Sequence, residues 1–394
     1  MKKYINLFYF SLVFVLNWDV IWTYLLDKSS GGFTGIILLF FTISMLTPIF
    51  KAKGGIKLFF KKPISIWFLW IGYSLINMFN SELSTSENLN ISFLGFVIMP
   101  LLLMVVISSV EGYKIKELLN VLLFASLLKI LISFVFDSFG NEFGGNRFGA
   151  EFNANMLGFS GNIVLLLLLV IKSLFKKLNL FHLLAAGIAI FIIYITASRK
   201  SFLCLVVIAY GYIYIFSGNQ NVIKYFRMAL GGLLLFSLGF FVFKDSEVVR
   251  RLTDTLSETS QAKTELEMFD GRAIQYVEGI EVFNDNKLTG IGLLNYKHFD
   301  EWELVLHSEY LVQLIECGII GSILYLYFNV YIIRKLLKLR KYKNYNQSAN
   351  VFLLYFIILI FLSFGSWTYN LMIWWIITGL SVRFINNLKL IQSS

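Results

Sequence analysis

Three short polar clusters stand out in a largely apolar chain, and their residue types suit anion binding and proton transfer. The first is Thr196-Ala197-Ser198-Arg199-Lys200, which connects two apolar runs. Ser198 is a suitable helix N-cap, so free backbone N–H groups, the positive end of the helix dipole and Arg199 would converge there. Such helix starts bind phosphate-like anions. The alternative is that Arg199 and Lys200 only anchor a helix end among lipid headgroups.

The second cluster is Asp270-Gly271-Arg272, followed by Tyr276 and Glu278. Asp270 can cap a helix, which puts Arg272 in the first turn, where a positive charge opposes the helix dipole. Stability alone would favour an acid at that position. Arg272 is therefore a second candidate for anion binding, the alternative being a solvated surface arginine.

The third cluster is His307-Ser308-Glu309-Tyr310-Leu311, at the start of a long apolar run. His307 can accept a proton near neutral pH, because an unperturbed imidazole has a pKa of about 6.5. Glu309, Gln313 and Glu316 are spaced by four and three residues and would share one helix face. An acid two turns into such a helix, as Glu316 is, is expensive to bury and marks either function or a partner on a neighbouring helix.

Composition shows what kind of structure must position these clusters. The chain has 57% hydrophobic and 15% charged residues, whereas soluble domains carry about 25% charged residues. We therefore expect an all-α integral membrane protein. Its net charge of +10 comes without a basic stripe interleaved with aromatics, so we expect no nucleic-acid partner. Cys204 and Cys317 lie in apolar runs without metal-ligand spacing, so neither a disulfide framework nor a metal site is expected.

Apolar runs bounded by charges or by Gly and Asn clusters predict about twelve transmembrane helices. The first run follows two lysines, but it is too long for a signal peptide and lacks a small-residue cleavage site, so it is read as a retained helix. The predicted helices lie near 4–26, 32–50, 63–80, 91–109, 117–137, 155–171, 181–197, 199–217, 226–243, 308–333, 349–366 and 368–387.

The distribution of basic residues in the connections predicts the orientation. Five lysines fall between Lys51 and Lys62, three between Lys172 and Lys177, and six basic residues between Arg334 and Lys343. The intervening connection from Asn80 to Asn90 has none. Because basic loops stay in the cytoplasm, both termini are expected on the cytoplasmic side of a plasma membrane, with all three polar clusters on its external face.

This even helix count places one large loop outside the membrane, between the ninth and tenth helices. We divide the chain into helices one to nine (residues 1–243), the external loop (244–307), and helices ten to twelve with a cytoplasmic C-terminus (308–394). Apolar residues recur at helical spacing within Ser246 to Glu258 and Asp270 to Asn284. The loop should therefore contain amphipathic helices that lie over the membrane.

Several motifs resemble those of one family. They are Asn146-Arg147-Phe148-Gly149 leading to Asn155, then Ser198-Arg199-Lys200, Arg272 with the later Gly290-Ile291-Gly292, and His307-Ser308 followed after nine residues by Gly318 and then Gly321. In a twelve-helix frame with a large loop before the last motif, the chain resembles the O-antigen polymerase and O-antigen ligase superfamily of bacterial polysaccharide assembly. Two departures are Lys287 and Ala154, where family members often have proline.

The resemblance implies transfer of a glycan from an undecaprenyl diphosphate carrier to an acceptor hydroxyl, with no nucleotide sugar, metal or other cofactor. The partners implied are the lipid-linked oligosaccharide, an acceptor glycolipid, the bilayer and other polysaccharide-assembly proteins. On this reading Arg199, Arg272 and Lys200 bind the diphosphate and His307 is the catalytic base. The supporting residues are Arg147, Asn155, Ser198, Tyr276, Glu309 and Glu316.

Three functions remain open at this point. The Ser198-Arg199-Lys200 stretch favours a polymerase that joins O-antigen or capsular repeat units. The alternative is a ligase that moves the finished glycan onto an acceptor lipid such as the lipid A core of lipopolysaccharide. A lipid or polysaccharide transporter is a lesser alternative, because the polar clusters fall at helix ends and no internal repeat is visible.

Overall fold

The computed structural model describes most of the helical part of the chain. The described residues are 2–17, 21, 40–44, 46, 49, 56–80, 98–111, 114–140, 154–196, 198–216, 272–293, 295–296, 308–365 and 372–386. Within these ranges the protein is all-helical, with no strand. The elements are α1 (Lys2–Leu16), the 3-10 helix η2 (Ile56–Phe60), α5 (Ile64–Asn80), α7 (Met99–Ser109), α8 (Ile115–Gly140), α9 (Ala154–Phe175), α10 (Leu180–Ile195), α11 (Arg199–Phe216), α14 (Arg272–Asp285), α15 (Glu309–Leu339), α16 (Asn346–Ser363) and α17 (Met372–Asn386).

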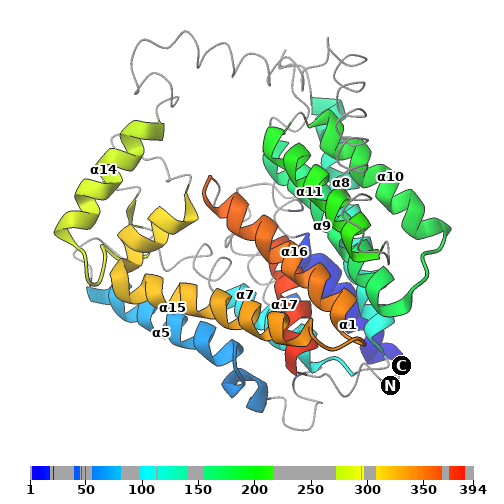
Figure 1. Cartoon of the computed structure of the whole chain (residues 1–394), viewed down its shortest axis with the longest axis horizontal. Helices are drawn as coiled ribbons and strands as arrows, with labels where there is room; N and C mark the ends of the chain where they lie inside the picture. The colour runs from blue at the N-terminus through cyan, green and yellow to red at the C-terminus, as the bar shows by residue number, and fades with distance from the viewer. Residues whose placement is uncertain are drawn as a thin grey trace.

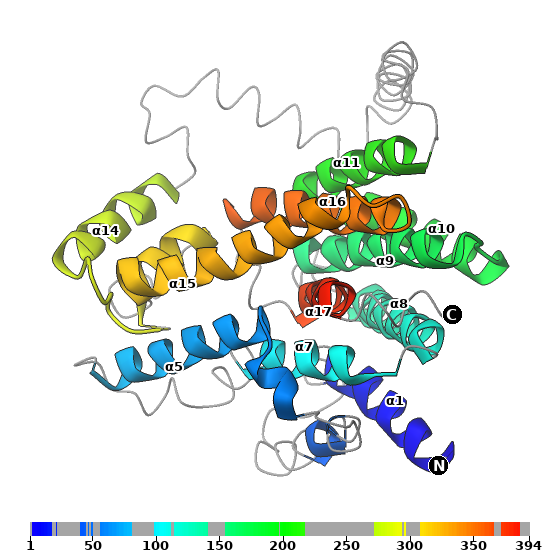
Figure 2. The same cartoon turned by 60° about the horizontal axis from the view of Figure 1, so that its bottom comes forward.

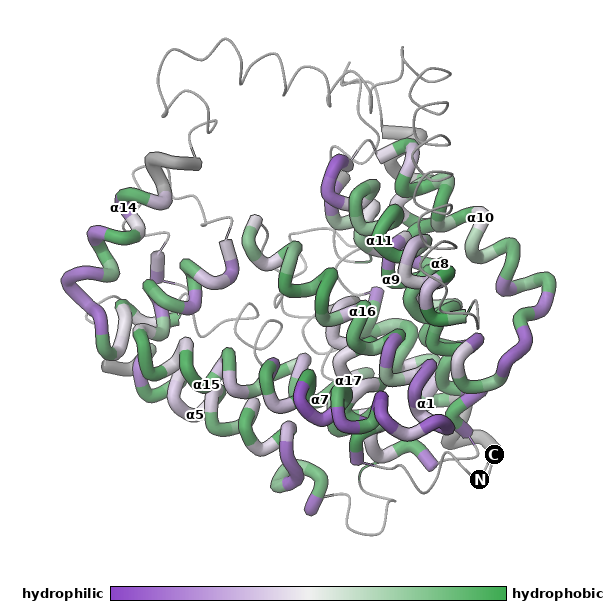
Figure 3. Tube along the Cα trace, viewed as in Figure 1, coloured by the Kyte–Doolittle hydropathy of each residue, from purple (hydrophilic) through white to green (hydrophobic). Residues whose placement is uncertain are grey.

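Five described helices are long and apolar enough to cross a membrane, judged by length and composition. Shorter apolar helices accompany them, and Figure 3 shows apolar residues along the helix bodies with hydrophilic residues at many of their ends. The count of twelve spans stays a prediction, because the expected helix at 226–243 and most of the one at 32–50 lie outside the described residues. The five spans are Ile115–Val135, Asn155–Phe175, Arg199–Phe216, Glu309–Leu339 and Asn346–Ser363.

Apart from α7, whose predicted first residues lie outside the described ones, the described helices begin within four residues of where the sequence places them, and α8, α9 and α15 run further. The helix predicted at 308–333 continues to Leu339, because the long side chains of Arg334, Lys335 and Lys338 can reach water from the last turns. A helix is present where one is expected within Asp270 to Asn284, as α14, while its place in an external loop stays a prediction. The other expected loop helix, Ser246 to Glu258, lies outside the described residues.

Two groups of helices, one around α9 and one around α15, meet at α16. On one side α9 contacts α8, α10, α11 and α16, and on the other α15 contacts α5, α14 and α16, while α17 lies against α7 (Figures 1 and 2). A buried aromatic cluster ties α5, α15 and α17 together. The ring of Trp67 lies 4.5 Å from those of Trp70 and Trp375 and 5.0 Å from that of Phe328.

Small residues allow the closest helix contacts. A Cβ atom added at Gly158 of α9 would lie 2.5 Å from Ser201 Oγ of α11, and one added at Gly211 of α11 would lie 2.4 Å from Leu354 Cδ2 of α16. Membrane helices associate through such close approaches, since lipid provides no hydrophobic drive between them. These glycines therefore set the spacing of α9, α11 and α16.

One end of the bundle is rich in basic residues, and we call it the lysine-rich end. Contacts between helix ends define it: Tyr9 donates to Glu117 at 3.3 Å, joining α1 to the start of α8, and Lys176 at the end of α9 donates to Gln347 at the start of α16. The described basic residues there include Lys57, Lys61, Lys62, Lys114, Lys116, Lys172, Lys176, Lys177, Arg334, Lys335, Lys338, Arg340, Lys341 and Lys343.

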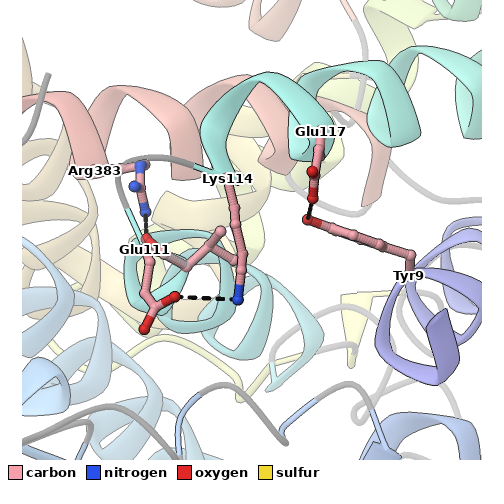
Figure 4. A network of polar contacts seen from close by, with 6 residues as sticks. Tyr9, Glu111, Lys114, Glu117 and Arg383 are labelled. Carbon is pink, nitrogen blue, oxygen red and sulfur yellow. Dashed lines mark hydrogen bonds and ion pairs between the residues drawn. The ribbon is translucent and has the colours of Figure 1, made fainter. Parts of the chain in front are cut away.

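A buried arginine closes α7 at the lysine-rich end. Arg383 of α17 is only 2% exposed, and its Nη1 donates to the carbonyl of Ile107 at 2.9 Å and also to that of Val110 (Figure 4). The last carbonyls of a helix lack partners inside the helix. The guanidinium of Arg383 is the hydrogen-bond donor for these carbonyls. In the adjoining turn Lys114 and Glu111 form an ion pair of 3.1 Å.

Candidate functional site

The tenth predicted helix is broken in the structure. Gly318 has φ 61° and ψ −170°, so α15 consists of a short segment from Glu309 to Cys317 and a longer one that runs to Leu339. The sequence predicts one continuous helix here, with Gly318 and Gly321 allowing close packing. A break frees backbone groups that must find partners elsewhere, because lipid offers none.

The segment after α14 supplies those partners. Residues 287–292 lie against the break and exchange backbone hydrogen bonds with both of its sides. The donors and acceptors are Ile291 N to Ile315 O at 3.0 Å, Gly292 N to Glu316 O at 2.9 Å, Ile319 N to Lys287 O at 2.9 Å and Ile320 N to Leu288 O at 3.3 Å. We call this arrangement the docked loop.

Two glycines make the docked loop sterically feasible. Gly290 has φ 75°, and a Cβ atom there would lie 2.5 Å from Glu316 O, while one at Gly318 would lie 2.4 Å from Leu288 O. Both distances are too short for any side chain, and both φ values disfavour one. Gly321 has a different role, since its Cβ atom would lie 2.8 Å from the Tyr73 ring, which confirms the expected close packing.

Two residues of α5 fasten the docked loop, and the sequence analysis missed both. Asn77 Nδ2 donates to Thr289 O at 2.7 Å and to Glu316 O at 2.9 Å, so one amide bridges the loop and the break. The Tyr73 hydroxyl lies 3.1 Å from Thr289 O and 2.9 Å from Cys317 O. Their spacing of four residues in an apolar helix puts both on one face, and that spacing was the available signal.

The acidic face expected on α15 is buried. Glu309, Gln313 and Glu316 are each at most 1% exposed. Glu316 Oε1 accepts from the backbone N–H of Tyr296 at 3.3 Å, and Glu309 Oε2 accepts from Ser363 Oγ of α16 at 3.3 Å. Both carboxylates therefore have hydrogen-bond partners on other elements, which indicates that each has a structural role.

The first polar cluster has the predicted N-cap. Ser198 is buried, its Oγ accepts from Ser201 N at 3.3 Å, and it donates to Asn155 Oδ1 at 2.9 Å. Asn155 is the second residue of α9, so this hydrogen bond brings the starts of α9 and α11 together. Two residues predicted to support the site, 43 positions apart, thus lie in contact.

The two cations that follow Ser198 are placed differently. Arg199 is exposed at the first position of α11, whereas the Lys200 ammonium donates to the carbonyl of Gly365, just past the end of α16. This end of α16 also contacts the start of α15, through Ser363 with Glu309 and through the Tyr310 hydroxyl, which donates to Ile360 O at 3.3 Å. The starts of α9, α11 and α15 therefore lie at one end of the bundle, opposite the lysine-rich end.

The remaining predicted site residues are only partly described. Arg272 is the first residue of α14, but its side chain, like all of Arg147 and His307, lies outside the described residues. His307 directly precedes Ser308, the N-cap residue of α15. Tyr276 is half-buried against the core, and α14 packs along α15. In the described part of the chain, no group of three or more His, Cys, Asp or Glu could hold a metal ion.

Comparison with known families decides the classification. Residues 183–326, which contain α11, α14, the docked loop and the break, match the family model described as O-antigen ligase. This match confirms the resemblance of that segment to the O-antigen ligase and polymerase superfamily. It supports a membrane glycan enzyme of that type. No curated protein sequence matches the chain.

The docked loop can be tested through Cys317, which is fully buried with its Sγ 3.9 Å from Ser74 Oγ. We expect Gly290→Ala to displace the loop, because the added methyl group meets backbone atoms at 2.5 Å. In a Cys204→Ser background, labelling of Cys317 by N-ethylmaleimide should become about tenfold faster or more as local opening increases.

Gly72→Ala is the matched control, because a Cβ atom at Gly72 would meet nothing within 4 Å. Its labelling rate should equal that of the parent. Slow labelling of Cys317 in both variants would contradict the prediction, because it would show that the docked loop accommodates a side chain at position 290.

Proposed function

We propose that this protein transfers a glycan from a polyprenyl diphosphate carrier to a hydroxyl of an acceptor glycolipid on the external face of the plasma membrane. One observation carries the proposal: the starts of α9, α11 and α15, with Arg199 and Lys200 at the start of α11, gather at the end of the bundle opposite the lysine-rich end. Two of these starts, those of α11 and α15, lie in the segment matched by the family model.

The orientation follows from the charge distribution. Basic residues at membrane-protein loops are retained in the cytoplasm, so the lysine-rich end faces inward and the starts of α9, α11 and α15 face outward. Both termini are then cytoplasmic, as the sequence predicts. Polymerisation and ligation of lipid-linked glycans both fit an outward-facing site.

The diphosphate is the group that this end of the bundle suits best. The positive dipole ends of α9, α11 and α15 attract an anion, and the exposed guanidinium of Arg199 can donate two parallel hydrogen bonds to phosphate oxygens. Arg272 at the start of α14 would supply a second guanidinium. Lys200 adds positive charge beside Arg199 while its ammonium holds the end of α16.

The transfer itself requires one base. The acceptor oxygen attacks the anomeric carbon, the carbon–oxygen bond to the diphosphate breaks, and the proton of the acceptor hydroxyl passes to His307. The lipid diphosphate leaves with the bonding electron pair, stabilised by the two arginines. A single displacement inverts the anomeric carbon. Asn155 and Ser198 hold the start of α11 in place, and Arg147, Tyr276, Glu309 and Glu316 support the site.

We favour the polymerase, in which both donor and acceptor are lipid-linked repeat units. The ligase is the second candidate, because the matched family model is described as O-antigen ligase. Glycolipids extracted from a strain lacking this protein separate the two. The polymerase predicts accumulation of single lipid-linked repeat units. Accumulation of long, unattached lipid-linked polymer would instead assign the ligase, and a normal glycolipid profile would contradict both.

The base assignment is tested with purified protein and lipid-linked repeat units. His307→Gln keeps hydrogen-bonding capacity but cannot take a proton near neutral pH, so kcat should fall by roughly 10²- to 10⁴-fold with little change in donor binding. Arg199→Lys should also lower turnover, because an ammonium lacks the planar fork of a guanidinium. The control is Lys177→Gln, an exposed residue of the lysine-rich end. Turnover by His307→Gln at the parental rate would overturn the base assignment.

A further inference from the structure

A cavity of about 270 Å³ opens at the lysine-rich end, far from the glycan site. It lies where α9 and α11 end and α16 begins, three helices that pack on one another. Its lining residues are Lys172, Lys176, Tyr212, Ile213, Phe216 and Gln347. Three helices that are distant in sequence therefore line the cavity, so it is not formed by one helix end alone.

The two lysines bring positive charge that these helices do not neutralise. Neither α9, α11 nor α16 contains an aspartate or a glutamate. The Lys172 ammonium instead donates to the Tyr212 hydroxyl and lies 4.4 Å from the centre of the Tyr212 ring and 5.1 Å from that of Phe216. Lys176 donates to the neutral side chain of Gln347. The cavity thus has cations without a carboxylate on its own helices.

The backbone at Lys176 favours a different residue. Its φ of 63° lies in the left-handed region, at the position after a helix end where glycine is usual. A lysine at this position is conformationally less favourable than a glycine, but it places a positive charge beside the cavity. The free backbone N–H groups at the start of α16 also favour an anion in the cavity, because they carry the positive end of the helix dipole.

The surface beside the cavity is apolar. One face of α11 exposes Leu203, Val206, Tyr210 and Tyr214, each between 42% and 48% accessible. In a membrane this face meets acyl chains, and it leads along α11 to the cavity at the helix end. An occupant with an anionic headgroup and a hydrocarbon tail matches both parts.

We propose that this cavity binds the headgroup of an anionic glycerophospholipid of the cytoplasmic leaflet, with an acyl chain along the exposed face of α11. Phosphate oxygens accept from Lys172 and Lys176, and basic recesses between helices at the cytoplasmic side suit such headgroups. The bound lipid joins α9, α11 and α16 at one end, while Ser198 and Lys200 join the same three helices to one another at the other end.

Native mass spectrometry of the detergent-purified full chain tests the proposal, with dioctanoyl phosphatidylglycerol as the probe. The double variant Lys172→Gln, Lys176→Gln should bind it about thirtyfold more weakly than the parent, from the usual contribution of two interfacial lysines. The variant Lys172→Arg, Lys176→Arg should retain binding, which separates lost charge from lost folding. The matched control is Lys57→Gln, Lys61→Gln, which removes equal charge at the same end of the bundle from exposed residues outside the cavity.

Three outcomes would overturn the proposal. Equal weakening by the control variant would mean general attraction to the lysine-rich end. Binding of inorganic phosphate as tight as that of the phosphatidylglycerol would make the ligand a free anion. Equal affinity for dioctanoyl phosphatidylcholine would mean that the positive charge of the cavity selects nothing. Loss of phosphatidylglycerol binding only in the Lys172, Lys176 glutamine variant, with transferase activity retained, supports it.

Discussion

The backbone hydrogen bonds between residues 287–292 and the break at Gly318 are the constraint on which the proposed glycan site depends. An unpaired peptide group in hydrocarbon costs several kcal/mol, so α15 can be broken there only while the docked loop is in place. Four hydrogen bonds of 2.9 to 3.3 Å join the two segments, and Asn77 adds a bridge from α5. The break sets the direction of Glu309 to Cys317, and this short segment begins directly after His307-Ser308. The loop also follows α14, so the elements that start with Arg272 and Glu309 share one anchor.

The electrostatic arrangement of the bundle complements this anchor. The starts of α9, α11 and α15 lie at the end opposite the lysine-rich end, where Ser198 joins α9 to α11 and Lys200 joins α11 to α16. An anion bound at that end would interact with the positive dipole ends of these helices and with the exposed guanidinium of Arg199. The lysine-rich end is the one that we propose faces the cytoplasm, and it carries the cavity between α9, α11 and α16. On the two proposals made above, each end would have its own anionic partner: a substrate diphosphate outside and a phospholipid headgroup inside.

Sequence reasoning was most successful where the signal was local. The helix at 63–80 matches α5 because its apolar run is uninterrupted, and the loop helix α14 follows from apolar spacing alone. The N-cap role of Ser198 is likewise a property of a few adjacent residues. The break in α15 could not be predicted, because a glycine in an apolar helix equally permits close packing, which is the role that Gly321 has. The partners of Lys200 and Asn77 lie 165 and more than 200 residues away, and no pattern within one segment encodes such contacts.

The central claim is that the docked loop and broken helix position the transferring groups, and turnover by an Asn77→Leu variant tests it most directly. Leucine has a similar volume but cannot donate to Thr289 O and Glu316 O. With lipid-linked repeat units as substrate, we predict a kcat about ten- to a hundredfold lower with KM nearly unchanged, because small misplacements of reacting groups have effects of this size. Ile76→Ala, at the neighbouring exposed position, should keep parental kinetics. A folded, monodisperse Asn77→Leu variant with parental kcat would contradict the account.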